Sequence, residues 1–325
     1  MTAEEILATS PWTLFPGDEK AIKTAFHGLL KKWHPDYNKD PRAASVTDYL
    51  IAAKAKVENK TKRPTAVMER RNGTKFQMEY IRLTQIDGLT IYTGQSSIAY
   101  FVPDSMCDLV ARNANVKWTF ATPKMETEMV RFLPSFVRTE DLKDGKLMIY
   151  RRKPNQILMS DLIQLHAGRI PPLHVSWMLS RLNNLACYLE WFQHVDFAIL
   201  PEYLLVDLDS HGVSLCGPRL FMTETDKRPI ALSARAMNYL PTIRNPNITS
   251  TPSMDRSMIR SLGCMLLGDP SGVRLPQDAL VKKEVAAWLV SPPAKTAVAD
   301  YEKWVATLGE RKFLHFGQTT KELYA

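Results

Sequence analysis

A proline between two helix-forming segments limits the fold of the N-terminal region more than any other feature of the sequence. Residues 18–33 carry apolar side chains at three- and four-residue spacing, which is typical of a helix that buries one face. Asp18 stands where an N-cap is expected. Pro35 ends this helix because proline has no N–H and restricts the residue before it. A second apolar stripe covers residues 43–57, so we expect two antiparallel helices joined by a short loop.

The pattern changes from helices to strands after a polar stretch. Residues 61–66 are polar and include a proline, so we expect a linker there. Asn72 and Gly73 are a two-residue hairpin signal. Further strands are expected over 74–83, 89–92, 97–102, 108–112 and 146–152, and later helices over 126–132, 173–192 and 257–267.

This order of elements predicts the fold class. We expect an α+β chain with a small all-α helical-hairpin domain at 1–60, followed by a second domain at 67–325. In the second domain, the strands come first and the helices later. We therefore expect it to have two lobes, a smaller β-rich lobe and a larger helical one.

The composition fits a folded protein. Of the 325 residues, 45% are hydrophobic and 23% are charged. The four cysteines lie far apart without metal-ligand spacing, so reduced thiols are expected. The sequence has no long apolar run and no basic leader, which predicts a cytoplasmic protein without a membrane segment. A net charge of +8 favours acidic partners, but the basic residues are spread along the chain, so nucleic-acid binding stays open without being favoured.

The tripeptide His34-Pro35-Asp36 stands at the tip between the two expected helices. Alone it is typical of an ordinary helix end, but here it follows a basic amphipathic helix. With this tripeptide, the segment from Ser10 to Val57 resembles the J-domain of DnaJ-like co-chaperones. The resemblance implies that this domain docks on a DnaK-type chaperone and that the tripeptide triggers ATP hydrolysis by that partner. The residues that it assigns to chaperone binding are Lys23, Phe26, His27, Lys31, Lys32, His34, Pro35, Asp36 and Asn38.

Two departures narrow the function that this resemblance implies. The chain has no Gly/Phe-rich linker and no C-x-x-C zinc region after the J-like segment. The resemblance therefore implies a specialised co-chaperone whose second domain selects a client or a location.

Residues from about 75 to 316 resemble the protein-kinase-like fold, best over 188–218. Phosphoryl transfer requires a carboxylate near the attacking hydroxyl, metal-binding Asp and Asn residues, and a lysine on the phosphates. Five positions that the resemblance assigns to catalysis hold other residues. Leu109 stands at the position of the strand lysine, Ala198 at that of the catalytic Asp and Leu200 at that of the following Lys. Tyr203 and Cys216 stand at the positions of the metal-binding Asn and the metal-binding Asp. The resemblance thus implies a pseudokinase, which is not an enzyme, holds no cofactor or metal, and binds a client or scaffold protein.

Two alternatives stay open. One is an atypical ATP-binding kinase-like enzyme that reuses Asp196, Asp207 or Asp209 for a metal ion. The other is a basic nucleic-acid-binding scaffold of a phage or mobile element. We also expect Asp255 to precede a buried helix, offset from the position where kinases place the aspartate that anchors the catalytic loop.

Overall fold

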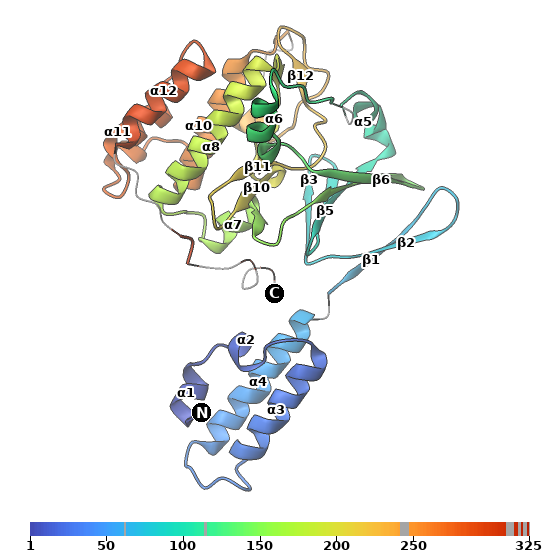
Figure 1. The fold of residues 1–325 in the computed structure, drawn as a ribbon, viewed down its shortest axis with the longest axis vertical. Coiled ribbons are helices and arrows are strands. Elements are labelled where there is room, and N and C mark those ends of the chain that lie inside the picture. Colours follow the sequence, from blue (N-terminus) through green and yellow to red (C-terminus); the bar gives the residue numbers. More distant parts are fainter. Residues whose placement is uncertain are drawn as a thin grey trace. The chain divides into compact units, whose positions relative to one another are not determined.

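The chain forms two compact units. The computed structural model describes residues 1–61, 63–113, 116–240, 247–309, 315–317, 320 and 324 (Figure 1). We call Met1–Thr65 unit 1 and Ala66–Tyr324 unit 2. Within the described residues, no helix combines the length and the apolar character that crossing a membrane requires.

Unit 1 is a small helical bundle. Its elements are α1 (Ala3–Ala8), α2 (Pro11–Leu14), α3 (Glu19–Trp33) and α4 (Ala43–Thr61). The Asp18 carboxylate caps α3 by accepting a hydrogen bond from the Ala21 N–H at 2.9 Å, as predicted. The predicted pairing of α3 with α4 is confirmed, and α4 continues four residues beyond its expected end at Val57.

The core of unit 1 explains why so short a segment folds. The apolar stripes of α3 and α4 face each other, and α1 and α2 close the open side of the pair. Each fully buried aliphatic or aromatic side chain contributes roughly 1.5–3 kcal/mol of transfer free energy. The principal buried side chains are Ile6, Phe15, Ile22, Phe26, Trp33, Val46 and Leu50.

Unit 2 begins with antiparallel strands. A hairpin of β1 (Thr65–Glu69) and β2 (Lys75–Glu79) turns at Asn72 and Gly73, and Gly73 has a φ of +80° that favours glycine. A five-stranded sheet follows with the order β3-β4-β5-β7-β6. Its strands are β3 (Arg82–Ile86), β4 (Leu89–Thr93), β5 (Ser97–Pro103), β6 (Phe136–Leu142) and β7 (Gly145–Arg151).

Two strand predictions in this region are wrong. The strand expected over 74–83 is divided between β2 and β3. The segment 108–112 is not a strand, because α5 (Cys107–Asn113) occupies it. Pro103 ends β5 and a 3-10 turn at Asp104–Met106 leads directly into this helix. A short apolar run has no decisive periodicity, and here the helical alternative holds.

The rest of unit 2 is mostly helical. The long helix α8 (Pro172–Trp191) packs against both α10 (Pro252–Leu266) and α12 (Ala297–Leu308). The coarse prediction of an α+β chain, with helices, then an antiparallel sheet, then a mainly helical region, is confirmed. The other elements are α6 (Pro123–Met129), β8 (Gln156–Leu158), α7 (Met159–Leu165), β9 (His194–Val195), β10 (Leu204–Asp207), β11 (Val213–Leu215), β12 (Thr223–Glu224), α9 (Ala236–Tyr239) and α11 (Lys283–Val290).

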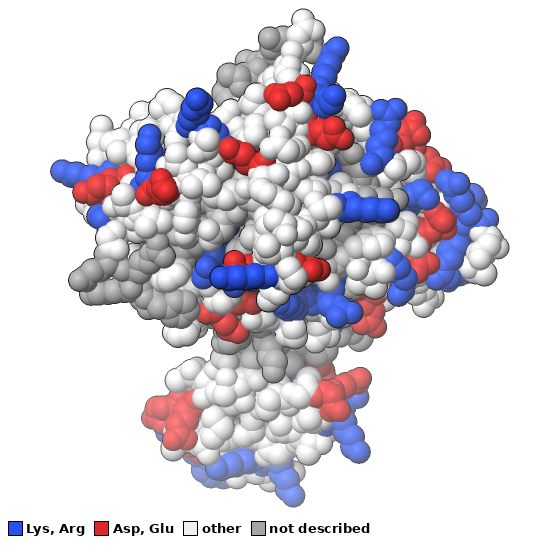
Figure 2. All heavy atoms as spheres, turned by 45° about the horizontal axis from the view of Figure 1, so that its top comes forward, with Lys and Arg blue, Asp and Glu red and all other residues white. Residues whose placement is uncertain are grey.

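Acidic and basic side chains are mixed on one face of unit 2. On the face that Figure 2 presents, Lys and Arg alternate with Asp and Glu and form no broad basic area. Binding to a phosphate backbone depends on clustered Lys and Arg. This face therefore offers no support for the nucleic-acid alternative.

Candidate functional site

The tripeptide His34-Pro35-Asp36 forms a tight corner where α3 ends. The His34 N–H donates to the Leu30 carbonyl at 2.8 Å and completes the helix. The His34 carbonyl then accepts hydrogen bonds from the N–H groups of Tyr37 and Asn38 at 3.0 and 2.9 Å. The side chain of His34 is 38% exposed and that of Asp36 is 74% exposed, so both are accessible to a partner.

Short polar contacts hold this corner in one shape. His34 Nδ1 accepts a hydrogen bond from the Asp36 N–H at 3.2 Å, which places the proton of the neutral ring on Nε2. Asn38 Nδ2 donates to the Lys32 carbonyl at 3.0 Å, and Asn38 Oδ1 accepts from the Asp40 N–H at 2.9 Å. Asn38 therefore ties the end of α3 to the loop, which is a positioning role.

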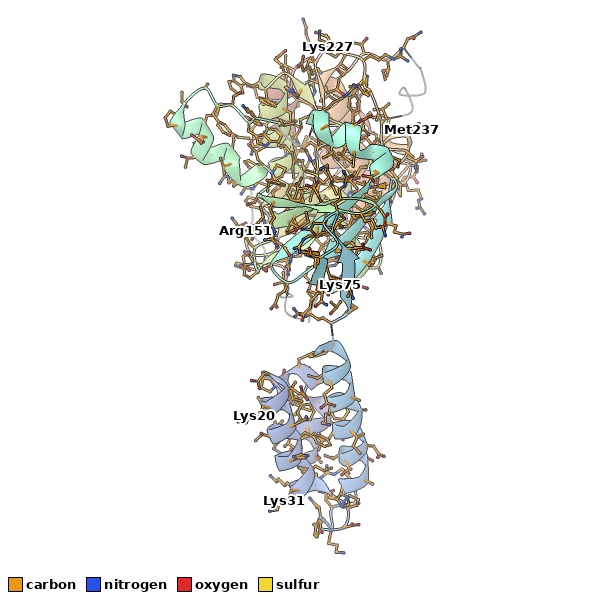
Figure 3. All side chains as sticks on the ribbon, turned by 90° about the vertical axis from the view of Figure 1, so that its right-hand side faces the viewer. Lys20, Lys31, Lys75, Arg151, Lys227 and Met237 are labelled. Atoms are coloured by element: carbon orange, nitrogen blue, oxygen red, sulfur yellow. The ribbon has the colours of Figure 1, made fainter. Side chains whose placement is uncertain are left out.

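The predicted basic residues lie at the surface of α3. Lys23, His27, Lys31 and Lys32 are all exposed. Lys20 and Lys31 project from the helix in Figure 3. Lys23 forms an ion pair with Glu19 at 2.7 Å, and this contact raises the pKa of the lysine. Lys31 and Lys32 lie nearer the tip and form no ion pair with a described residue, and Lys32 Nζ donates to the Met1 carbonyl at 3.4 Å.

Phe26 does not belong with the surface residues. Its ring is buried in the core of unit 1, 6.0 Å from the ring of Phe15, and the ammonium of Lys54 lies 4.8 Å from its centre. The assignment of Phe26 to chaperone binding stays a prediction, and in the structure Phe26 packs α3 against its neighbours. Its position on the apolar stripe of residues 18–33 already indicated this role.

In unit 2, the loop at residues 196–203 is anchored from a helix. The Asp255 carboxylate accepts hydrogen bonds from the N–H of Asp196 at 2.9 Å and from that of Phe197 at 3.3 Å. Burial and the neighbouring Asp196 carboxyl raise the pKa of Asp255. The expectation that Asp255 precedes the buried helix is wrong, because α10 begins at Pro252, a residue that favours the first helical position.

The carboxyl of Asp196 forms a buried ion pair with Arg219. Arg219 Nη1 lies 3.0 Å from Asp196 Oδ2, and both side chains are buried. Burial raises the pKa of Asp196, and the arginine opposes that rise. A carboxylate enclosed in this way cannot reach a solvent-borne metal ion.

The other acids proposed for a metal site, Asp207 and Asp209, take part in the turn between β10 and β11. Asp207 Oδ1 accepts the N–H groups of Asp209 and Ser210 at 3.1 and 2.9 Å, and Asn155 Nδ2 donates to both carboxylates. Among the described residues, no group of three or more His, Cys, Asp or Glu side chains could hold a metal ion. These contacts give the metal-reusing alternative no support.

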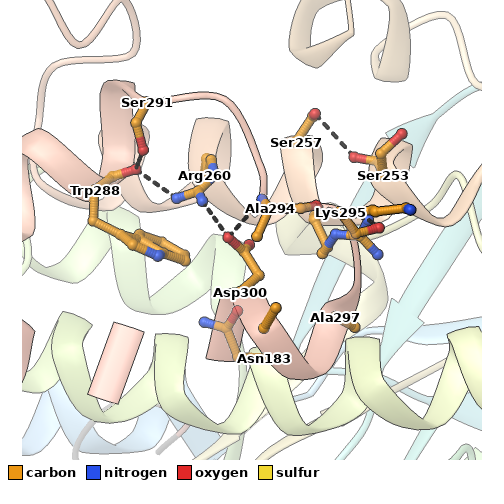
Figure 4. A network of polar contacts seen from close by, with 12 residues as sticks. Asn183, Ser253, Ser257, Arg260, Trp288, Ser291, Ala294, Lys295, Ala297 and Asp300 are labelled. Atoms are coloured by element: carbon orange, nitrogen blue, oxygen red, sulfur yellow. Dashed lines mark hydrogen bonds and ion pairs between the residues drawn. The ribbon is translucent and has the colours of Figure 1, made fainter. Parts of the chain in front are cut away.

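A second buried ion pair stabilises the helical region in a similar way. Arg260 Nη2 lies 2.6 Å from Asp300 Oδ1, and the guanidinium lies 3.7 Å from the centre of the Trp288 ring (Figure 4). The same Asp300 oxygen accepts the Ala294 N–H at 3.0 Å. This network joins α10, α11 and α12, so its role is structural.

The positions that the kinase resemblance assigns to catalysis lie in the core. Leu200, Tyr203 and Cys216 are connected through the backbone, since Tyr203 N donates to the Leu200 carbonyl at 2.9 Å and Cys216 N donates to the Tyr203 carbonyl at 2.7 Å. Ala198 is buried beside them. Burial raises the pKa of the Cys216 thiol to about 11, so it stays protonated at neutral pH.

Tyr100, which the sequence analysis did not single out, fills the space between these residues and the sheet. Its ring stacks on that of Tyr203, with centroids 5.9 Å apart and planes 12° apart, and Tyr150 packs edge-on at 5.8 Å. The Tyr100 hydroxyl donates to the Glu202 carbonyl at 2.9 Å. We call Tyr100, Tyr150 and Tyr203 the tyrosine stack.

Leu109, which the resemblance assigns to the position of the strand lysine, is not on a strand. It lies on helix α5, whereas protein kinases carry this lysine on the third strand of the small lobe. The third strand of the five-stranded sheet is β5, which has the sequence SIAYFVP and contains no lysine. The side chain that β5 contributes to the buried centre is Tyr100, and no local motif marks it.

The first hairpin of the sheet is fastened to the helical region. Asp87, in the turn between β3 and β4, accepts a hydrogen bond at 2.6 Å from the Ser233 hydroxyl. Close by, Arg235 forms an ion pair with Glu202. These contacts hold the turn between β3 and β4 against the rest of unit 2.

The buried centre formed by Ala198, Leu200, Cys216 and the tyrosine stack is filled by apolar and aromatic side chains. The sequence matches no protein-family model and no curated protein.

Replacing Gly217 by alanine should destabilise unit 2 by about 2–3 kcal/mol. Gly217 has a φ of +79°, and an added Cβ would lie 2.6 and 2.7 Å from two ring carbons of Tyr100. Gly73 is a matched control, because its φ is +80° but nothing lies within 4 Å of an added Cβ. Urea denaturation should give Gly73→Ala a loss of only about 1 kcal/mol. Equal losses for the two variants would mean that the Tyr100 ring does not press on Gly217.

Proposed function

We propose that this chain is a J-domain co-chaperone whose kinase-like second domain is catalytically inactive and binds a client or scaffold protein. The observation that carries the proposal is the exposed His34-Pro35-Asp36 corner at the tip of the α3–α4 hairpin. The direct test is the single-turnover ATPase rate of a DnaK-type chaperone with and without this chain.

Charge and rigidity support docking of unit 1 on such a chaperone. Lys31 and Lys32 are exposed next to the corner and can steer association with an acidic surface, at a rate that falls as salt is added. The hydrogen bonds of His34 and Asn38 already fix the loop, so binding orders few additional groups. In this mechanism the partner carries out the chemistry, and unit 1 supplies the trigger.

Three features support a two-lobed protein-kinase-like fold for unit 2. An antiparallel sheet precedes a mainly helical region, as expected for a β-rich and a helical lobe. The loop at residues 196–203 is anchored by a buried aspartate, Asp255. A glycine, Gly217, follows Cys216 at the position assigned to the metal-binding segment.

The inactivity of this domain is proposed because other side chains occupy its centre. The tyrosine stack fills the region beside Cys216 and Gly217, and Asp196 is committed to Arg219. In this proposal the domain binds its partner through residues on its surface.

Mg-ATP should leave the melting temperature of the chain unchanged. A ligand present at about 100 times its Kd would stabilise the folded state by about 2.7 kcal/mol, which raises the melting temperature by several degrees. The measurement is differential scanning fluorimetry of the full chain with millimolar ATP, with and without magnesium. A rise that requires magnesium would instead favour the atypical ATP-binding enzyme.

A further inference from the structure

A groove on the sheet of unit 2 lies apart from the tyrosine stack. Its volume is about 360 Å³, and residues of β2, β6 and β7 line it. That volume lies within the range of sites that bind a small ligand or a few side chains.

Apolar side chains form part of the groove, and the polar Gln77, Ser96 and Ser97 also line it. Phe76 and Ile149 form the floor as part of a small core between the β1–β2 hairpin and the sheet, and Met78 packs against that core. Val137 is 43% exposed on the wall, and its neighbour Phe136 is also exposed. Protein interfaces are enriched in aromatic residues, Met and Arg, so this composition suits a peptide or protein partner.

The charged residues that line the groove are both arginines. Arg138 is 58% exposed and donates to Glu140 at 2.7 Å, which leaves part of its guanidinium free. Arg151 is exposed at the surface of unit 2 (Figure 3) and forms no ion pair within the part of the chain that the structure describes. Among the described residues that line the groove there is no acid, and Glu140 contacts Arg138 from outside the lining, so the free charge that complements an acidic ligand comes mainly from Arg151.

An open strand edge borders the groove. β2 belongs to a two-stranded sheet in which its described partner is β1, so its other edge has backbone groups available for pairing. An extended peptide that adds to such an edge gains main-chain hydrogen bonds, while alternate side chains enter the neighbouring pockets. The groove therefore favours an extended ligand over a folded helix.

The geometry points to this groove as the site where unit 2 binds its partner, through an extended segment in which acidic and apolar side chains alternate. Apolar side chains of the segment lie on Phe76, Ile149 and Val137, while its carboxylates pair with Arg138 and Arg151. This inference rests on the proposed function, since it names the chemistry of the protein that the kinase-like domain binds.

The test is a selection on the full chain from a random library of peptides of about twelve residues, followed by fluorescence anisotropy of an enriched peptide. We expect enrichment of peptides with acids spaced by apolar residues. Arg151→Glu should raise the Kd of such a peptide at least about tenfold. Val137→Asp, which puts a carboxylate on the apolar wall, should weaken binding similarly.

Arg228→Glu is the matched control. Arg228 is also an exposed arginine and does not line the groove, so this variant should bind the peptide like the wild type. Circular dichroism melts establish that each variant is folded. Enrichment of basic peptides, of none, or of peptides that bind Arg151→Glu equally well would overturn the inference. Self-association or oligonucleotide binding that is lost in Arg151→Glu would also overturn the inference, because the groove would then bind a second copy of the chain or a nucleic acid.

The two proposals can fail separately. Arg151→Glu should stimulate the chaperone ATPase like the wild type, and His34→Gln should still bind the peptide. If no peptide is selected but the ATPase is stimulated, only the assignment of the groove as a binding site is rejected. If a peptide is selected but the ATPase is not stimulated, only the co-chaperone function is rejected.

Discussion

Replacing His34 by glutamine should lower the stimulation of a DnaK-type ATPase at least about tenfold, to near the basal rate of the chaperone. Glutamine cannot reproduce the ring that accepts the Asp36 N–H and presents a second nitrogen to a partner. The measurement is single-turnover ATP hydrolysis by the chaperone of the native host, with the full chain added in excess.

The fold of unit 1 should survive this substitution. His34 is partly exposed at a helix end, so the expected change in the free energy of unfolding is within about 0.5 kcal/mol. His166→Gln, at a half-buried histidine of unit 2, is the control and should stimulate like the wild type. Full stimulation by His34→Gln would rule out the mechanism proposed for the tripeptide.

Replacing Arg219 by alanine should destabilise unit 2 by about 3–5 kcal/mol. The substitution leaves the Asp196 carboxyl buried without its counter-ion, and an unpaired buried charge is far more costly than the loss of the pair as a whole. It also removes the guanidinium that lies 5.6 Å from the centre of the Tyr203 ring. Chemical denaturation should shift the transition of unit 2 and leave that of unit 1 in place.

A double variant distinguishes an unpaired charge from lost packing. Combining Arg219→Met with Asp196→Asn removes both charges and should recover much of the stability. Arg274→Ala is the surface control, because Arg274 is 77% exposed and its ion pair with Asp269 is long, at 3.8 Å. This substitution should lower the free energy of unfolding by less than about 1 kcal/mol. If Arg219→Ala is as mild as Arg274→Ala, the Asp196–Arg219 pair does not hold the loop.

The sequence predicted unit 1 better than unit 2 because its signals are local. Asp18, the apolar stripes and Pro35 each act within a few residues, and together they define α3, α4 and the corner between them. The apolar stripe of residues 18–33 also indicated that Phe26 is buried, and the structure places it in the core.

The predictions for unit 2 failed where tertiary contacts decide the outcome. The segment around Leu109 is too short for its period to separate helix from strand. The start of α10 could have been read from Pro252, and Asp255 would then have fallen inside the helix. Tyr100 and Arg219 carry no local signal, because their importance comes from Tyr203 and Asp196, which lie far away in the sequence.

The tyrosine stack also constrains how this chain can change over evolutionary time. Replacing Tyr203 by asparagine alone would leave a void beside the Tyr100 ring, while an aspartate in place of Cys216 alone would bury an uncompensated carboxylate. Each of these two single substitutions would therefore give a less stable molecule. The tyrosine stack therefore resists single substitutions in the centre of unit 2, so sequence changes are better tolerated at its surface.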